Sequence, residues 1–216
     1  MPSPAQRSET DGPWSATNRS VYSAAGGRLE TLELWLVRHG ETPASRDGVL
    51  AGWRDVPLTE TGVAQAEAVR PVLAGETFDG VWSSDLQRAV HTARLAWGDA
   101  VADPRLREIS FGELEGREWA TLDPAFKRAL AAFDGFHPPG GESLDDLRAR
   151  VSGFLAELAP GRHLLFTHGG VIRSLTREAG QDGFLPTGTV VALDWSRRRV
   201  LFTRESPIPA PRPFDD

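Results

Sequence analysis

The 216-residue chain contains no cysteine and no apolar run long enough to cross a membrane. The lack of cysteine excludes disulfide bonds, thiolate metal ligands and cysteine nucleophiles. Without a run of about eighteen apolar residues, the sequence predicts no transmembrane helix. Acidic residues outnumber basic ones by 30 to 24, and the resulting net charge of −6 argues against nucleic-acid binding. With 40% apolar and 25% charged residues, the chain has the composition of an ordinary globular domain.

Lysine is nearly absent as well. Lys127 is the only one, so every other basic side chain is an arginine. The guanidinium group is planar and always charged, and its paired donors suit carboxylate or phosphate. An anionic substrate is therefore compatible with this acidic chain, provided that a few arginines converge at one place.

The two ends of the chain differ in composition from its middle. Residues 1–30 are rich in Ser, Pro, Thr and Gly without apolar periodicity, which predicts a disordered extension. They lack a basic start followed by an apolar run, so no secretory signal is expected. Residues 206–216 contain four prolines and are interpreted as a Pro-rich tail. A single domain is expected over 31–205.

Between these ends, strand and helix patterns alternate. Strands are expected at 32–37, 80–83, 163–167, 189–195 and 200–203, and helices at about 59–73, 85–96, 143–158 and 171–179. Residues 117–137 interrupt the alternation with an expected helical insert. The alternation predicts an α/β fold of three layers, α/β/α, with a mainly parallel sheet and the short insert over the site.

Histidines follow two of the expected strands. The first strand ends in LVRHGET, which places Arg38, His39 and Glu41 at its carboxyl end. A later strand ends in LLFTHGG and places His168 there. Ligands of open α/β sheets bind at the carboxyl ends of the strands. Two imidazoles and an arginine at one edge of the sheet indicate an anion pocket.

The LVRHGET segment resembles the signature of the histidine phosphatase superfamily, also called the phosphoglycerate mutase-like family. Further segments resemble the family's motifs in the same order: PLTETG (57–62), SSDLQRAVHTA (83–93), LREISFGELEG (106–116), PGGESLDDLRARV (139–151) and THGGVIR (167–173). The resemblance extends over about residues 32–203. It implies the α/β fold of that family, with the insert covering the active site.

The resemblance also implies a role for each matching residue. His39 corresponds to the nucleophile that forms a phosphohistidine, and Arg38 and Arg88 to the arginines that hold the phosphate. His168 corresponds to the second histidine, and Glu108 to the general acid, although Glu113 and Glu115 lie close enough in sequence to compete. No cofactor and no metal are implied, and the sequence has no metal-ligand spacing.

Substrate contacts are expected from Arg38 and Arg88 and from four further positions: Thr42, Ser45, Gly52 and Gly169. Many family members carry Trp-Asn directly after the GET segment, and that asparagine helps to hold the phosphate. This chain has Pro43-Ala44-Ser45 instead. The Ser45 hydroxyl has a shorter reach, so a weaker or more permissive phosphate grip is expected.

Several functions share these residues. A phosphomonoesterase that acts on a small phosphorylated metabolite is favoured over a cofactor-dependent mutase, because mutases of the family carry a longer insertion between the positions of Glu108 and His168. An α-ribazole-5′-phosphate phosphatase of cobalamin assembly is a narrower alternative. An inactive, ligand-binding member is disfavoured because all five motif residues are present. A cytoplasmic monomer or homodimer is expected, without nucleic-acid or membrane partners.

Overall fold

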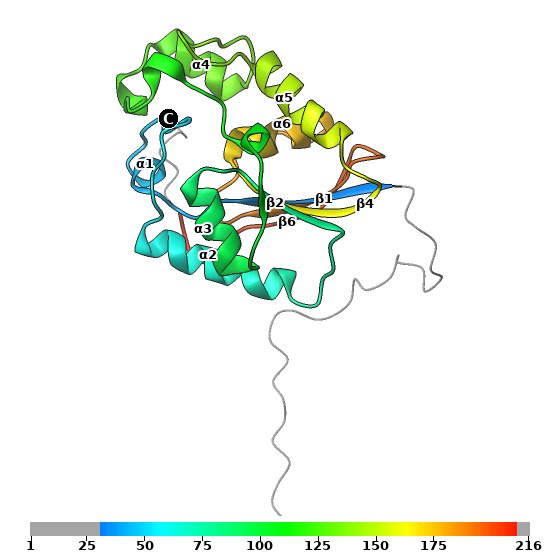
Figure 1. Ribbon diagram of the computed structural model, residues 1–216. Coiled ribbons are helices and arrows are strands. Elements are labelled where there is room, and N and C mark those ends of the chain that lie inside the picture. Colours follow the sequence, from blue (N-terminus) through cyan, green and yellow to red (C-terminus); the bar gives the residue numbers. More distant parts are fainter. Residues whose placement is uncertain (1–30, 211–216) are drawn as a thin grey trace, which may run out of the picture.

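Apolar strands from across the chain pair into one sheet of six strands in the order β3-β2-β4-β1-β5-β6 (Figure 1). The strands are β1 (Leu32–Arg38), β2 (Gly80–Ser83), β3 (Val101–Ala102), β4 (Gly161–Thr167), β5 (Val190–Asp194) and β6 (Arg199–Arg204). β5 is antiparallel to both of its neighbours, and the other pairs are parallel. The expected mainly parallel sheet is confirmed.

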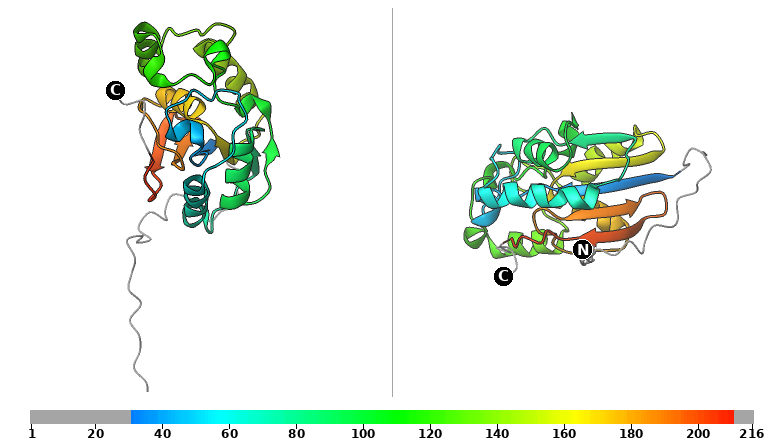
Figure 2. Two further views of the ribbon diagram at one scale, coloured as in Figure 1. Left: turned by 90° about the vertical axis from the view of Figure 1, so that its left-hand side faces the viewer. Right: turned by 90° about the horizontal axis from the view of Figure 1, so that it is seen from below.

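The computed structural model describes residues 31–210, so the predicted extension 1–30 and the last part of the predicted tail, 211–216, lie outside the described residues. The α-helices are α1 (Pro43–Arg46), α2 (Glu60–Leu73), α3 (Gln87–Ala96), α4 (Pro124–Ala132), α5 (Leu144–Ala156) and α6 (Gly169–Glu178). Short 3₁₀ helices span Pro104–Leu106, Gly112–Leu114 and Trp119–Thr121. Helices α2 and α3 cover one face of the sheet and α5 and α6 the other (Figure 2), which confirms the three layers.

Both faces of β1 are buried, which explains its continuous apolar sequence. Trp35 and Val37 pack in a cluster with residues of α2 and α3. Leu34 and Leu36 pack in a second cluster with residues of α5 and α6. A strand that is covered on both faces needs apolar side chains at successive positions rather than alternating ones. The strand that carries Arg38 is thereby fixed at the centre of the fold.

The expected helix starts are confirmed at two caps. Thr59 Oγ1 accepts from the Gly62 amide at 3.0 Å and begins α2. Ser143 Oγ accepts from the Asp146 amide at 3.1 Å and begins α5. Such caps satisfy amides that have no partner inside the helix.

Other boundaries differ from expectation. Helix α3 begins at Gln87 rather than near Asp85, because the backbone of Leu86 is extended and the Gln87 amide donates to the Asp55 carboxylate at 2.8 Å. Helix α6 begins earlier than expected, at Gly169. Strand β3 was not expected at all: it has two residues, which is too short for any periodicity.

The expected insert forms a 3₁₀ turn followed by α4, and it lies over the end of the sheet where β1 terminates (Figure 1). Asp123 caps α4 by accepting from the Ala125 amide at 2.8 Å, and Phe133 ends the helix with a left-handed backbone at φ +52°. Phe133 and Phe136 are buried under the insert. The insert is therefore attached to the domain by its own aromatic side chains.

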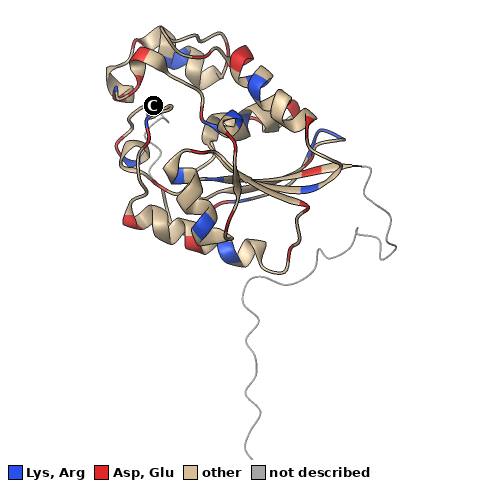
Figure 3. Cartoon of the chain, viewed as in Figure 1, with Lys and Arg blue, Asp and Glu red and all other residues tan. Residues whose placement is uncertain are grey.

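Charged residues of both signs are spread over the helices of both layers, while the inner parts of the strands are largely uncharged (Figure 3). Within residues 31–210, no helix is both long enough and apolar enough to span a bilayer.

Candidate active site

The backbone that follows β1 is held against α2 by a close approach of two glycines. A Cβ on Gly40 would lie 2.2 Å from the carbonyl oxygen of Gly62, and a Cβ on Gly62 would lie 2.1 Å from that of Glu41. The Gly40 amide also donates to Thr92 Oγ1 at 3.0 Å. Any larger side chain would separate these segments, so the two glycines fix the turn in which His39 lies.

Strand pairing brings the two candidate histidines together. Arg38 at the end of β1 is the register partner of Thr167 at the end of β4, and the strands are parallel. The next residues, His39 and His168, therefore emerge side by side, with ring centroids 5.1 Å apart. The expectation of two imidazoles at one sheet edge is confirmed.

One nitrogen of His39 is fixed by the backbone. Nδ1 lies 2.7 Å from the carbonyl oxygen of Gly40. A carbonyl oxygen only accepts, so Nδ1 carries the proton and Nε2 is left as the unprotonated nitrogen. Burial, assisted by the charges of Arg88 and Arg38, lowers the pKa of His39 well below its ordinary value of 6.5. His39 is therefore neutral at neutral pH, as a nucleophile must be.

His168 is fully buried. Its Nε2 lies 2.8 Å from the hydroxyl oxygen of Ser84, whereas its Nδ1 is buried without a protein partner. Burial, followed by the charge of Arg88, lowers the pKa of His168 well below its ordinary value of 6.5. The bond to Ser84 fixes the orientation of the ring.

Two buried arginines flank the histidines. Arg38 Nη1 donates to the carbonyl oxygen of Leu185, and Arg88 Nη2 donates to that of Gly52 at 2.8 Å. The Nε atoms of both arginines are buried without a protein partner. Burial lowers the pKa of Arg38 to about 10, which leaves it charged at neutral pH. Buried donors without partners are rare in native structures, and these two are suited to an anionic ligand.

The side chain of Glu108 lies beside the first turn of α6. Its carboxylate accepts from the amides of Ile109 at 2.9 Å and Gly170 at 3.0 Å. The N-cap residue of α6, His168, makes no side-chain cap bond, so Glu108 takes the place of a capping side chain. The positive end of the helix dipole lies at the same point. Glu108 is thus held at the first turn of α6, where it lines the cavity.

The two competing glutamates are placed differently. Glu113 is exposed. The Glu115 carboxylate accepts from the Trp53 amide at 2.9 Å, and it fills the space where a Cβ on Gly52 would lie, 2.2 Å from Oε1. Gly52 has a φ of +51°, which also favours glycine. Glu115 therefore supports the loop of Gly52, while Glu108 lines the cavity.

The expected substrate-contact residues also line the cavity. Thr42 Oγ1 accepts from the Ser45 amide at 3.1 Å, and Ser45 Oγ accepts from the Thr42 amide at 2.9 Å, which together cap α1. A Cβ on Gly169 would lie 3.3 Å from Cζ of Arg38. Ser45 Oγ also donates to the carbonyl oxygen of Thr42 at 3.1 Å, which leaves it less free to donate to phosphate than the asparagine of the family that the sequence resembles. Substrate contact by these residues stays a prediction.

The cavity has a volume of about 290 Å³ and a mostly apolar outer wall. The apolar wall residues are Val49, Leu50, Ile109, Phe111, Trp119, Leu130, Phe133, Phe184 and Leu185. Among the lining residues of the described chain, Arg173 is the one cation beside Arg38 and Arg88, and its Nε lies 2.6 Å from the Asp182 carboxylate. The wall thus offers apolar contact and one partly neutralised charge.

The depressed pKa values of His39 and His168 predict how stability depends on pH. Below about pH 6.5 an unfolded histidine takes up a proton that the buried, neutral form does not, so the unfolded state gains protons. Each buried neutral histidine therefore makes its full contribution to the free energy of unfolding above that pH. As the pH falls below it, the contribution is lost by about 1.4 kcal/mol per pH unit for each histidine.

Urea unfolding of the wild type and of His39→Gln at pH 7 and pH 5.5 measures this effect. The wild type should lose stability more steeply than the variant over this interval. Equal slopes would contradict a depressed pKa of His39.

Comparison with known proteins agrees with this geometry. Residues 34–192 match the family model described as the histidine phosphatase superfamily (branch 1), and the chain belongs to this family. The chain is similar to the adenosylcobalamin/alpha-ribazole phosphatase of Escherichia coli K12, with 37% identity over 67% of this chain and 77% of that protein. It is also similar to fructose-2,6-bisphosphatase TIGAR B of Danio rerio, with 38% identity over 70% of this chain. The match spans only 62% of the length of TIGAR B.

Solved structures show the same fold. The crystal structure of TTHB049 from Thermus thermophilus is 52% identical, with a TM-score of 0.75 over 80% of this chain and 99% of that chain. A structure described as phosphoglycerate mutase from the same organism is 53% identical, with a TM-score of 0.74 over 79% of this chain and 97% of that one.

Some residues of the site were not assigned from the sequence. Ser84 stands inside the quoted SSD segment, but nothing in the sequence pairs it with His168. Thr92 lies one helical turn after Arg88, and its contact with Gly40 depends on tertiary packing. Phe184 and Leu185 stand in a loop without periodicity, and Arg38 lies over the Phe184 ring at 5.0 Å.

Proposed function

We propose that the protein is a phosphomonoesterase that hydrolyses a small phosphorylated metabolite through a phosphohistidine on His39. The observation that carries the proposal is the state of His39: its Nδ1 is fixed on the Gly40 carbonyl, it is neutral, and it lines a cavity beside two buried arginines. This arrangement leaves Nε2 as a nucleophile next to a site for an anion.

In the first half-reaction, His39 Nε2 attacks phosphorus and the ester P–O bond breaks. Arg38 and Arg88 hold the phosphoryl oxygens, and the orphaned Nδ1 of His168 supplies a further polar contact. The leaving alcohol takes a proton from the Glu108 carboxyl group.

In the second half-reaction, the Glu108 carboxylate accepts a proton from water as the water attacks phosphorus. The N–P bond breaks, inorganic phosphate is released, and the lone pair returns to Nε2. Glu108 is again protonated, so the cycle closes without a metal or cofactor.

The apolar wall supports a monoester with a partly apolar alcohol. A bisphosphate would need a second group of cations, and the described lining offers only Arg173, which is already paired with Asp182. This favours hydrolysis over a bisphosphate-dependent mutase reaction. The α-ribazole phosphatase reaction stays a narrower candidate, supported by the similar Escherichia coli protein. A cytoplasmic location and a monomeric or homodimeric state stay predictions.

A substrate panel tests the proposal. Purified protein, with and without EDTA, is assayed for phosphate release from aryl, long-chain alkyl and polar monoesters and from a sugar bisphosphate, and for conversion of 3-phosphoglycerate with 2,3-bisphosphoglycerate. We expect the highest kcat/KM with the apolar monoesters and no effect of EDTA. Formation of 2-phosphoglycerate faster than phosphate release, or a large loss with EDTA that a divalent ion restores, would contradict the proposal.

A further inference from the structure

The segment that carries Glu108 has no regular structure of its own. It follows the 3₁₀ turn Pro104–Leu106, and residues 107–111 belong to no helix or strand. Neither a helix nor a ladder of strand bonds therefore fixes the backbone of the proposed acid. Other groups must hold it, and the structure shows which.

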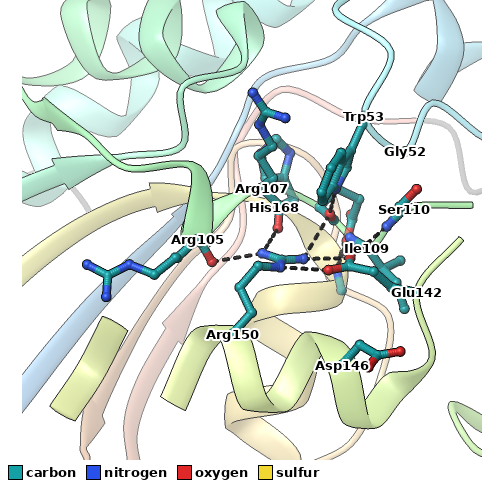
Figure 4. Close-up of polar contacts among 12 residues, drawn as sticks. Gly52, Trp53, Arg105, Arg107, Ile109, Ser110, Glu142, Asp146, Arg150 and His168 are labelled. Carbon is teal, nitrogen blue, oxygen red and sulfur yellow. Dashed lines mark hydrogen bonds and ion pairs between the residues drawn. The ribbon is translucent and has the colours of Figure 1, made fainter. Parts of the chain in front are cut away.

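One side chain, Arg150 of α5, donates to two carbonyl groups of this segment and to one of the preceding 3₁₀ turn. Its Nη1 donates to Arg105 O at 2.8 Å and Arg107 O at 2.9 Å, and its Nη2 donates to Glu108 O at 3.2 Å. Figure 4 shows Arg150 reaching from α5 toward these carbonyl groups. A single guanidinium group thus holds the backbone both before Glu108 and at Glu108 itself.

Glu142 completes the arrangement from the other side. Its carboxylate accepts from Arg150 Nε and Nη2, each at 2.8 Å, and from the Ser110 amide at 2.9 Å. The side chains of Arg150 and Glu142 are 14% and 15% exposed. All five N–H groups of Arg150 are therefore directed at a partner, which a lysine with three donors on one nitrogen cannot reproduce.

The same carbonyl group links Glu108 to the phosphate side of the cavity. Glu108 O also accepts from Trp53 Nε1 at 2.7 Å. Trp53 follows Gly52, whose carbonyl oxygen accepts from Arg88. The position of the acid is thereby connected to the position of an arginine that holds the phosphate.

We propose that Arg150 and Glu142 are positioning residues that hold Glu108 in place for proton transfer to the leaving alcohol. Arg150 is not among the residues that line the cavity, so it acts through the 105–110 backbone and not by contact with substrate. This inference rests on the proposed role of Glu108. A displacement of about 1 Å from the productive position can cost about a hundredfold in rate, and here the loss falls on the step that needs the acid.

The test compares Arg150→Lys and Glu142→Gln with the wild type, using an alkyl phosphate and p-nitrophenyl phosphate. Nitrophenolate leaves without a proton, so only the alkyl ester depends on the acid during phosphoryl transfer to His39. Hydrolysis of the phosphoenzyme is common to both esters, so the comparison uses kcat/KM, which reports the steps up to that transfer. We expect kcat/KM to fall about ten- to a hundredfold for the alkyl ester and less than about threefold for p-nitrophenyl phosphate. Arg150→Lys keeps the charge, so the loss reports geometry.

Arg162→Lys is the matched control. Arg162 is equally buried at 13% exposure and is bound to Glu33 and Glu76, at the amino end of β4, far along the strand from His168. This variant should have a lower melting temperature and an unchanged ratio of the two rates. If Arg162→Lys changed the ratio of the two rates as well, the inference would be overturned, because a general loss of rigidity in the fold would then explain the result.

Glu108→Gln, measured in parallel, separates the two proposals. If Glu108→Gln changes the ratio and Arg150→Lys and Glu142→Gln do not, the positioning role is wrong and the proposed function stands. If Glu108→Gln leaves the ratio unchanged, Glu108 is not the acid, and the positioning role falls with it.

Discussion

Replacement of His39 by alanine should lower turnover of every phosphate ester by roughly 10⁴-fold or more, because no other group can accept the phosphoryl group. The fold should survive, since His39 lies in the turn after β1 and the apolar clusters of the core do not include it. The variant should melt within a few degrees of the wild type.

Rapid quenching at alkaline pH measures the intermediate directly. The wild type should show acid-labile protein-bound phosphate and His39→Ala none. His91→Ala, a substitution at an exposed position of α3, is the control and should behave like the wild type. Comparable turnover by His39→Ala would contradict the phosphohistidine mechanism.

Glu108→Gln should have the second-largest effect, and one that depends on the leaving group. General acid catalysis contributes about a hundred- to ten-thousand-fold, and alkyl esters should lose that amount. p-Nitrophenyl phosphate should lose much less in the first step. In the proposed mechanism the same carboxylate activates water, so dephosphorylation should become limiting and the phosphoenzyme should accumulate.

Glu113→Gln is the control for this experiment, because Glu113 is exposed and lies in the same segment. It should retain the wild-type rate on both esters. If Glu113→Gln carried the leaving-group dependence and Glu108→Gln did not, the acid would have been assigned to the wrong glutamate, whereas the family and the nucleophile would be unaffected.

Much of the fold could be predicted because each main element has a local signal. The continuous apolar run of β1 and the caps at Thr59 and Ser143 are visible in the sequence and are confirmed. Strand β3 has no such signal, since its two residues, Val101 and Ala102, are exposed and are defined only by pairing with β2.

The site divides in the same way. The residues that follow β1 and β4 could be found because the carboxyl ends of parallel strands meet at one edge. Arg150 and Glu142 could not, because α5 carries several charged residues and the sequence does not tell which of them points inward. Their contacts with residues 105–110 exist only once α5 has packed on the sheet.

The strand order has a consequence for how the protein is made. The residues of β1 are synthesised early, yet the two partner strands, β4 and β5, are more than 120 residues further along the chain. At about 5–20 residues per second, ribosomes take roughly 6 to 25 s to supply β4. For that time the apolar β1 has neither partner strand, and such unpaired strands favour aggregation. The pairing that brings His39 beside His168 is thus also a late and non-local step of folding, so fragments that end before β4 should depend on chaperones and have no catalytic centre.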